Sequence, residues 1–165
     1  MGKKIIVPIA LVAAAFVFQH NKARLTEPGT IEHPVYGETR FSIGASDDSL
    51  DILMLTKAAS ASDCESQTER IEQQIKSGAF AMCKDCSVPQ STCSEVLPPR
   101  LANLFENKPS SLTYLSLLRG RPEEREHRLI FWGVSVELSD TLCDEVDEFQ
   151  ARRAGEVTCV RARRG

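Results

Sequence analysis

The chain has 165 residues, a formal net charge of −3 and 42% hydrophobic residues, a composition that is ordinary for a globular protein. A mildly acidic balance does not suit general nucleic-acid binding, which requires a basic surface. The length and composition therefore predict a globular protein without a nucleic-acid partner.

The N-terminus has the pattern of a secretory signal. Lys3 and Lys4 precede an uninterrupted apolar run at 5–18, and a short positive region before about 7 to 15 apolar residues is typical of such signals. As a helix this run would extend about 21 Å, less than a hydrocarbon core of about 30 Å. We therefore expect residues 1–23 to be a signal peptide. The alternative is an uncleaved inner-membrane anchor at 5–18, because the exit after Ala23 lacks a small residue at the third position before the cut.

In either case, we expect the rest of the chain to be periplasmic or secreted, in an oxidising compartment. Residues 24–38 contain two prolines and two glycines without sustained periodicity, and they predict an irregular lead. A single domain is then expected at 39–165.

The first elements of that domain are predicted to be two strands and a helix. Residues 39–43 alternate between polar and apolar, and the dense apolar run 50–56 favours a second strand over a short helix. A capping box at Ser62 and Glu65 then predicts the start of a helix that Gly78 ends. The inward stripe of this helix comprises Cys64, Thr68, Ile71, Ile75 and Ala79.

The second part of the domain is predicted to contain a hairpin. After a cysteine-rich loop at 80–97, a short helix is expected to begin at Pro98-Pro99 with Leu101, Leu104 and Phe105 inward. The runs 112–118 and 128–138 flank a charged stretch, which indicates two antiparallel strands joined by a long polar loop. Alternation in the second run places these residues on one face: Ile130, Trp132, Val134, Val136 and Leu138.

A final helix is expected to begin at Ser139-Asp140 and to end at Gly155, before a last strand at 156–161. This order of elements predicts an α+β fold, a small antiparallel sheet with two to three helices packed on one face and stabilised by disulfides. Both long helices begin with a Ser-Asp pair and carry an early cysteine after a β run, which suggests a faint internal duplication.

Six cysteines in an exported chain predict three disulfides. Cys143 and Cys159 are expected to pair, since a helix that returns into an adjacent strand brings two such residues close together. Among the remaining four, we favour Cys64 with Cys83 and Cys86 with Cys93. The alternative, Cys64 with Cys93, leaves Cys83 and Cys86 as a C-x-x-C pair.

That alternative has possible chemistry, because a C-x-x-C pair at a helix N-terminus can exchange disulfides. Here no strand leads into Cys83 and no helical stripe leaves Cys86, so a structural disulfide is favoured over a redox site. Four thiolates could also bind zinc, but the spacing is not that of paired knuckles and export favours oxidation. We expect no metal and no cofactor.

Few side chains suggest catalysis. The three histidines have no partner at the spacing of a triad or a metal site, and His127 is expected to be solvated in the polar loop. Motifs of nucleophilic serines, phosphate loops and zinc proteases are missing from the sequence. A glycosidase-like pair of carboxylates is not excluded by the sequence, since such residues meet only in the folded structure. The prediction leans against an enzyme, and no catalytic residue is assigned.

Two arginine-rich stretches are candidate binding surfaces. The hairpin loop carries Arg119, Arg121, Arg125 and Arg128 among glutamates, and a self-neutralised solvated loop is the simpler interpretation. The C-terminal stretch 152–164 holds five arginines and could contact a membrane surface or an acidic partner. The favoured alternative is that these arginines balance the acidic helix at 140–148.

The function that these patterns favour is an exported, disulfide-stabilised binding module of the bacterial periplasm or envelope. The bacterial source is inferred from the short signal and from the lack of any N-x-S/T sequon. Its partner would be an unknown protein or envelope component. The alternative function is thiol-disulfide exchange through Cys83 and Cys86.

Overall fold

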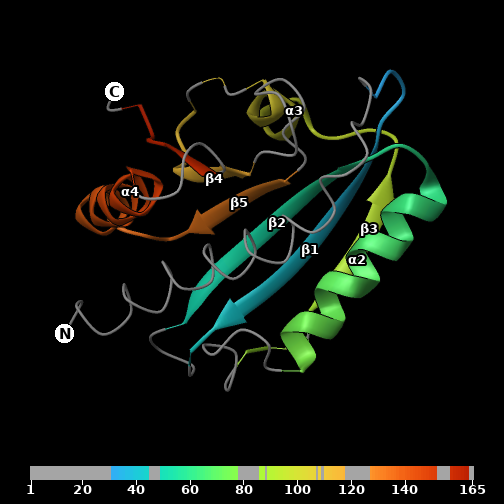
Figure 1. Cartoon of the computed structure of the whole chain (residues 1–165), viewed down its shortest axis with the longest axis horizontal. Helices are drawn as coiled ribbons and strands as arrows, with labels where there is room; N and C mark the ends of the chain where they lie inside the picture. The colour runs from blue at the N-terminus through green and yellow to red at the C-terminus, as the bar shows by residue number, and fades with distance from the viewer. Residues whose placement is uncertain are drawn as a thin grey trace.

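A six-stranded antiparallel sheet organises the protein (Figure 1). The computed structural model describes residues 31–44, 49–77, 86–87, 89–106, 108, 110–117, 127–151 and 157–163. The strands are β1 (Val35–Ile43), β2 (Leu50–Ala58), β3 (Gln90–Ser94), β4 (Tyr114–Leu117), β5 (His127–Trp132) and β6 (Val157–Val160). The helices are α2 (Ala61–Lys76), α3 (Pro99–Phe105) and α4 (Val136–Ala151). This is the α+β fold that the sequence predicts.

The order of the strands repeats one topology twice. The sheet runs β3-β1-β2-β5-β4-β6, and every neighbouring pair is antiparallel. The segment β1-β2-α2-β3 and the segment β4-β5-α4-β6 each place their last strand beside their first, and β2 and β5 join the two halves. The similarity seen between the two long helices in the sequence therefore extends to the topology.

The two halves also share details of their packing. In each half a disulfide joins the helix to the last strand, with Cα atoms 6.2 Å apart in the first half and 5.2 Å apart in the second. The strand cysteines, Cys93 and Cys159, lie opposite Gly37 and Leu115, and the residue before each of those is a tyrosine. A repeated ββαβ unit accounts for these correspondences.

Helices cover both faces of the sheet. On one face Ile71 and Ile75 of α2 and Leu142 and Val146 of α4 enter the larger apolar cluster. On the opposite face Leu101 and Leu104 of the short helix α3, with Leu97 just before it, form a second cluster with Leu53, Leu55, Tyr114 and Ile130 of the sheet. Residues 52–55 of β2 are all buried for this reason, and burial of each such side chain stabilises the fold by about 1.5–3 kcal/mol. The dense apolar run is thus a central strand, as expected.

The first half differs from its prediction mainly at its ends. β1 begins at Val35, inside the stretch that was expected to be irregular. α2 begins at Ala61 because Ser60 is its N-cap, with Ser60 Oγ accepting a hydrogen bond from the Asp63 amide at 3.1 Å. The capping box predicted at Ser62 is therefore wrong by two residues. The predicted stripe is buried at Cys64, Thr68, Ile71 and Ile75, whereas Gly78 and Ala79 lie outside the described residues.

In the second half, the hairpin β4–β5 is confirmed but its second strand is shorter than predicted. Gly133 has a φ of +71°, a left-handed conformation that ends β5 after Trp132. α4 then begins at Val136, so the prediction of a strand to Leu138 is wrong. β3 was not predicted at all, because its five residues, QSTCS, are polar and lie at a sheet edge.

Candidate functional site

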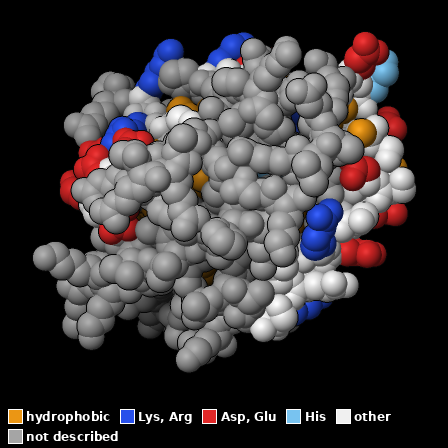
Figure 2. All heavy atoms as spheres, in the orientation of Figure 1, with side chains coloured by type: hydrophobic (Ala, Val, Ile, Leu, Met, Phe, Trp, Pro, Cys, Tyr) orange, Lys and Arg blue, Asp and Glu red, His pale blue; other side chains and the backbone are white. Residues whose placement is uncertain are grey.

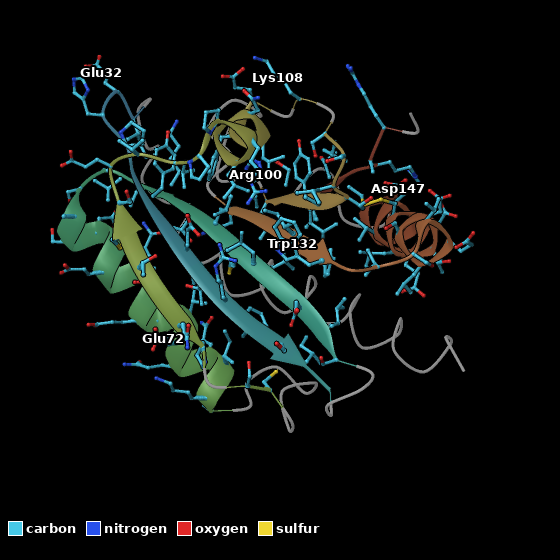
Figure 3. The ribbon with its side chains drawn as sticks, turned by 180° about the vertical axis from the view of Figure 1, so that it is seen from behind. Glu32, Glu72, Arg100, Lys108, Trp132 and Asp147 are labelled. Carbon is cyan, nitrogen blue, oxygen red and sulfur yellow. A yellow bond between two sulfur atoms is a disulfide. The ribbon has the colours of Figure 1, made fainter. Side chains whose placement is uncertain are left out.

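The α3 side of the sheet is only partly covered. α3 has seven residues and packs on Leu53, Leu55, Tyr114 and Ile130, so within the described part of the chain it does not reach the adjacent ends of β1, β2 and β5. A concavity of about 580 Å³ lies there, lined by Arg40, Ser42, Asp51, Gln90, Arg100 and Trp132 among others. We refer to it as the Trp132 concavity. Figure 3 shows the labelled Arg100 and Trp132 close together over this face.

The strand registers explain why these side chains converge. Ser42 lies opposite Asp51, and Asp51 lies opposite Trp132, so these residues form one row across β1, β2 and β5. Arg40 is two residues before Ser42 on the same face, opposite Gln90 of β3. The floor of the concavity is therefore built on hydrogen-bonded strands, which fixes the relative positions of its side chains.

Serine residues tie the edge of this floor together. Ser42 Oγ donates a hydrogen bond to Asp51 Oδ1 at 2.6 Å. The amide of Ser42 donates to Ser87 Oγ at 2.7 Å, and the amide of Ser87 donates to the Ser42 carbonyl at 3.0 Å. Ser87 thus extends the row beyond β1, and the Asp51 carboxylate is held in place.

Two guanidinium groups flank the row. Arg40 forms an ion pair with Glu38 at 3.0 Å, and its side chain is 59% exposed, so the pair is worth only about 0–1 kcal/mol. The Arg100 guanidinium lies 6.0 Å from the centroid of the Trp132 ring and is exposed. Among the described residues, no carboxylate forms an ion pair with Arg100. Both arginines are therefore available to an outside anion.

Trp132 is the least satisfied residue of the site. Its Nε1–H is buried and has no hydrogen-bond acceptor within the described part of the chain. A buried donor without an acceptor costs about 1–3 kcal/mol, and such a group in a native fold calls for an explanation. An acceptor supplied by a ligand is one explanation.

A second concavity, of about 790 Å³, lies at the start of α4, lined by Leu112, Val134, Val136 and Arg161 among others. Its main charged group is already neutralised, because Arg161 approaches three carboxylates of α4. The distances are 3.8 Å to Asp140 Oδ1, 2.6 Å to Asp144 Oδ1 and 3.4 Å to Asp147 Oδ2. Figure 2 shows acidic side chains gathered over α4 at the same side of the molecule. Arg163 is the other cation of its lining, but among the described residues this concavity has no buried donor without an acceptor comparable with Trp132 Nε1–H.

The position of Arg161 bears on the C-terminal arginines. Arg161 contacts the carboxylates of α4, as the favoured interpretation predicts for arginines that balance the acidic helix. The Arg163 amide donates to the Ser110 carbonyl at 2.8 Å, which ties the residues after β6 to the segment before β4. The other three arginines of the C-terminal stretch lie outside the described residues.

The predicted arginine loop is corrected at Arg128. This residue is fully buried, and its Nε and Nη2 donate to the carbonyls of Leu104 and Phe105 at 2.8 and 3.0 Å. Its guanidinium also lies 4.8 Å from the Phe105 ring centroid. Arg128 therefore stabilises the last turn of α3 and is not a surface binding residue. The loop residues Arg119, Arg121 and Arg125 lie outside the described part of the chain.

His127 was also expected to be solvated, and that expectation is wrong. It is 1% exposed, and its Nδ1 lies 3.1 Å from Thr56 Oγ1, within hydrogen-bond distance across the β2–β5 pair. The sequence places His127 and Arg128 at the end of a charged stretch, but β5 begins earlier than its apolar pattern indicates.

The cysteines adopt the alternative pairing. Cys143 is bonded to Cys159, as expected, but Cys64 is bonded to Cys93. The favoured pairs of Cys64 with Cys83 and Cys86 with Cys93 are therefore wrong, because the unpredicted strand β3 brings Cys93 beside α2. The same bond removes the four-thiolate zinc site. Cys86 is disulfide-bonded, and Cys83 lies outside the described residues.

Two groups with shifted acidities lie away from the Trp132 concavity. Hydrogen bonds from Lys76 and then from Ser91 lower the pKa of Glu72, and partial burial raises the pKa of Tyr36. Within the described ranges, no three or more histidine, cysteine, aspartate or glutamate residues gather as metal ligands would. No described helix is both long and apolar enough to cross a membrane.

The residues of the concavity were not singled out from the sequence, apart from Trp132. Arg40 follows the alternation of β1 and could have been assigned to the face opposite Phe41. Arg100 carries no such signal, because its position depends on where α3 packs. No protein family, curated protein or solved structure matches this chain.

Proposed function

We propose that the protein is an exported, disulfide-stabilised binding module of the bacterial periplasm or envelope, and that it holds its partner in the Trp132 concavity. The observation that carries the proposal is the convergence of Arg40, Asp51, Arg100 and Trp132 from four different elements on one open face. Tryptophan and arginine are among the residues most enriched at the energetic centres of protein interfaces. Their placement on three strands and a helix suits recognition, because sites on such elements are held more precisely than sites on loops.

The disulfides are compatible with this setting. Each long helix is bonded to the edge strand of its own half, and such bonds persist in oxidising compartments. Both edges of the sheet are thereby attached to the helical layer. A binding face carried by such a sheet keeps its shape without a ligand.

The experiment compares retention of envelope components by the oxidised full chain and by charge-reversed variants. Arg40→Glu and Arg100→Glu change exposed side chains of the concavity, and Arg70→Glu on α2 is the matched control on the opposite face. We expect a specific component to be retained by the wild type and by Arg70→Glu, and to be lost from the two concavity variants. Equal retention by all four proteins would contradict the proposal. Cell fractionation tests export separately. A cytoplasmic protein with free thiols would contradict the proposed export.

A second candidate function is thiol-disulfide exchange through Cys83 and Cys86. The Cys64–Cys93 and Cys143–Cys159 bonds account for four of the six cysteines, so the bonded state of Cys86 leaves Cys83 as its partner by count. Cys86 is half-exposed, which favours access by a thiolate. Mild reductant followed by alkylation should then label only this pair while the fold persists. Labelling that appears only after denaturation would assign the pair a structural role.

A further inference from the structure

We propose that the ligand of the Trp132 concavity is an acidic, extended polypeptide segment, whose carboxylates bind Arg100 and Arg40 and whose backbone crosses the row of strands. This inference rests on the proposed function and names the chemistry of its partner. It follows from the charges, the unsatisfied donor and the length of the row.

The charges favour an anionic partner. Arg100 has no ion-pair partner among the described residues, and the exposed Arg40 side chain is held only by the carboxylate of Glu38, two residues away. A guanidinium binds a carboxylate through two parallel hydrogen bonds, which no side chain of the described concavity provides to Arg100. A carboxylate from a partner would therefore gain these bonds and displace only the weak contact between Arg40 and Glu38.

The unsatisfied donor favours a partner rich in acceptors. The Trp132 Nε1–H is buried without an acceptor among the described residues, and the exposed Arg100 guanidinium lies 6.0 Å from the centroid of the same ring. A segment whose carboxylate binds Arg100 would therefore bring its own backbone carbonyls beside the indole, where one could accept from Nε1–H. Polypeptides carry such carbonyls at regular spacing, in addition to any acidic side chains.

The length of the row suits an extended chain. From Trp132 on β5 through Asp51 and Ser42 to Ser87, the row spans four hydrogen-bonded segments. At about 4.8 Å between strands this is about 14 Å, or roughly four extended residues. Asp51 faces the middle of the row, where it can accept a backbone N–H of the segment. It also repels a carboxylate at that position, so acidic side chains are directed toward the two arginines.

The test uses the single tryptophan of the chain as its reporter. The oxidised full chain is titrated at low salt with a synthetic peptide of alternating glutamate and serine, and with the same peptide carrying glutamine in place of glutamate. We expect saturable change in Trp132 emission with the first peptide and at least about tenfold weaker binding of the second. Arg100→Gln should lower the affinity for the glutamate peptide by about tenfold, whereas Arg70→Gln should leave that affinity unchanged.

Several results would overturn the inference. Equal affinity for the two peptides would remove the role of the carboxylates, and full competition by inorganic phosphate at the peptide's concentration would indicate a general anion site. Binding to phosphatidylglycerol vesicles that is lost in Arg100→Gln would indicate a membrane surface instead. Circular dichroism of each variant distinguishes loss of binding from loss of fold.

The two proposals fail separately. If Arg100→Glu abolishes retention of an envelope component but the glutamate peptide does not bind, the ligand class is wrong and the binding face stands. If retention is unaffected by either concavity variant and no peptide binds, both proposals are wrong.

Discussion

Replacement of Arg128 by methionine tests whether this buried arginine supports α3, and through it the binding face. The guanidinium donates hydrogen bonds to two carbonyls in the last turn of α3. The last carbonyls of a helix have no donor within the helix, so they need partners from elsewhere. Each such charge-assisted bond contributes about 1.5–3 kcal/mol net, and the contact with the Phe105 ring adds about 0.5–2 kcal/mol. Methionine avoids the desolvation of a buried charge, which offsets part of the loss.

We therefore expect Arg128→Met to lower the free energy of unfolding by about 3 kcal/mol, since the lost bonds exceed the relieved desolvation. With a urea dependence of about 2 kcal/mol per M, the unfolding midpoint should fall by about 1.5 M. Arg128→Lys keeps the charge but not the planar guanidinium, so its unfolding midpoint should lie between those of the wild type and Arg128→Met.

The assay is equilibrium urea unfolding, followed by far-UV circular dichroism and by Trp132 fluorescence. The emission of the native variant should also shift, because α3 carries Arg100 over the indole ring. Arg70→Met on the exposed face of α2 is the control and should stay within about 0.5 kcal/mol of the wild type. If Arg128→Met is as stable as this control, the last turn of α3 does not depend on the guanidinium and the reasoning is refuted.

Three further predictions concern the helical layer of the sheet. Alanine at both cysteines should cost about 3.6 kcal/mol for the α2–β3 disulfide and about 3.1 kcal/mol for the α4–β6 disulfide, because the loops span 29 and 16 residues; urea unfolding of the two variants tests the order. Gly37→Ala should cost about 1–3 kcal/mol in the same assay, since its Cβ would lie 2.7 Å from Thr68 Cγ2, and Thr68→Ser should recover part of that loss if the clash is real. Glu72 has a lowered pKa in the folded state, so its contribution is present above its unfolded pKa of about 4.3 and is lost as the pH falls through the folded value. Glu72→Gln should therefore destabilise by about 0.3–0.5 kcal/mol at neutral pH and by nothing measurable at pH values below the folded pKa; an equal loss at both would contradict this.

Local patterns in the sequence were sufficient for much of the fold. The prolines before Leu101 start α3, and the alternation in β5 places Ile130 and Trp132 on one face. The pairing of Cys143 with Cys159 was also predictable, because a helix and the strand that follows it are neighbours in the chain as well as in space. In each case, the interaction that decides the structure lies within a few residues or across one connection.

Only the tertiary structure decided the rest, because it depends on which strands become neighbours. β3 is polar and becomes a strand through its pairing with β1, and that pairing brings Cys93 to Cys64 across 29 residues. Arg128 is buried because α3 ends above it, although its neighbours in the sequence are charged. The Trp132 concavity likewise exists because β2 and β5 join the two halves side by side, a contact between segments that no local periodicity encodes.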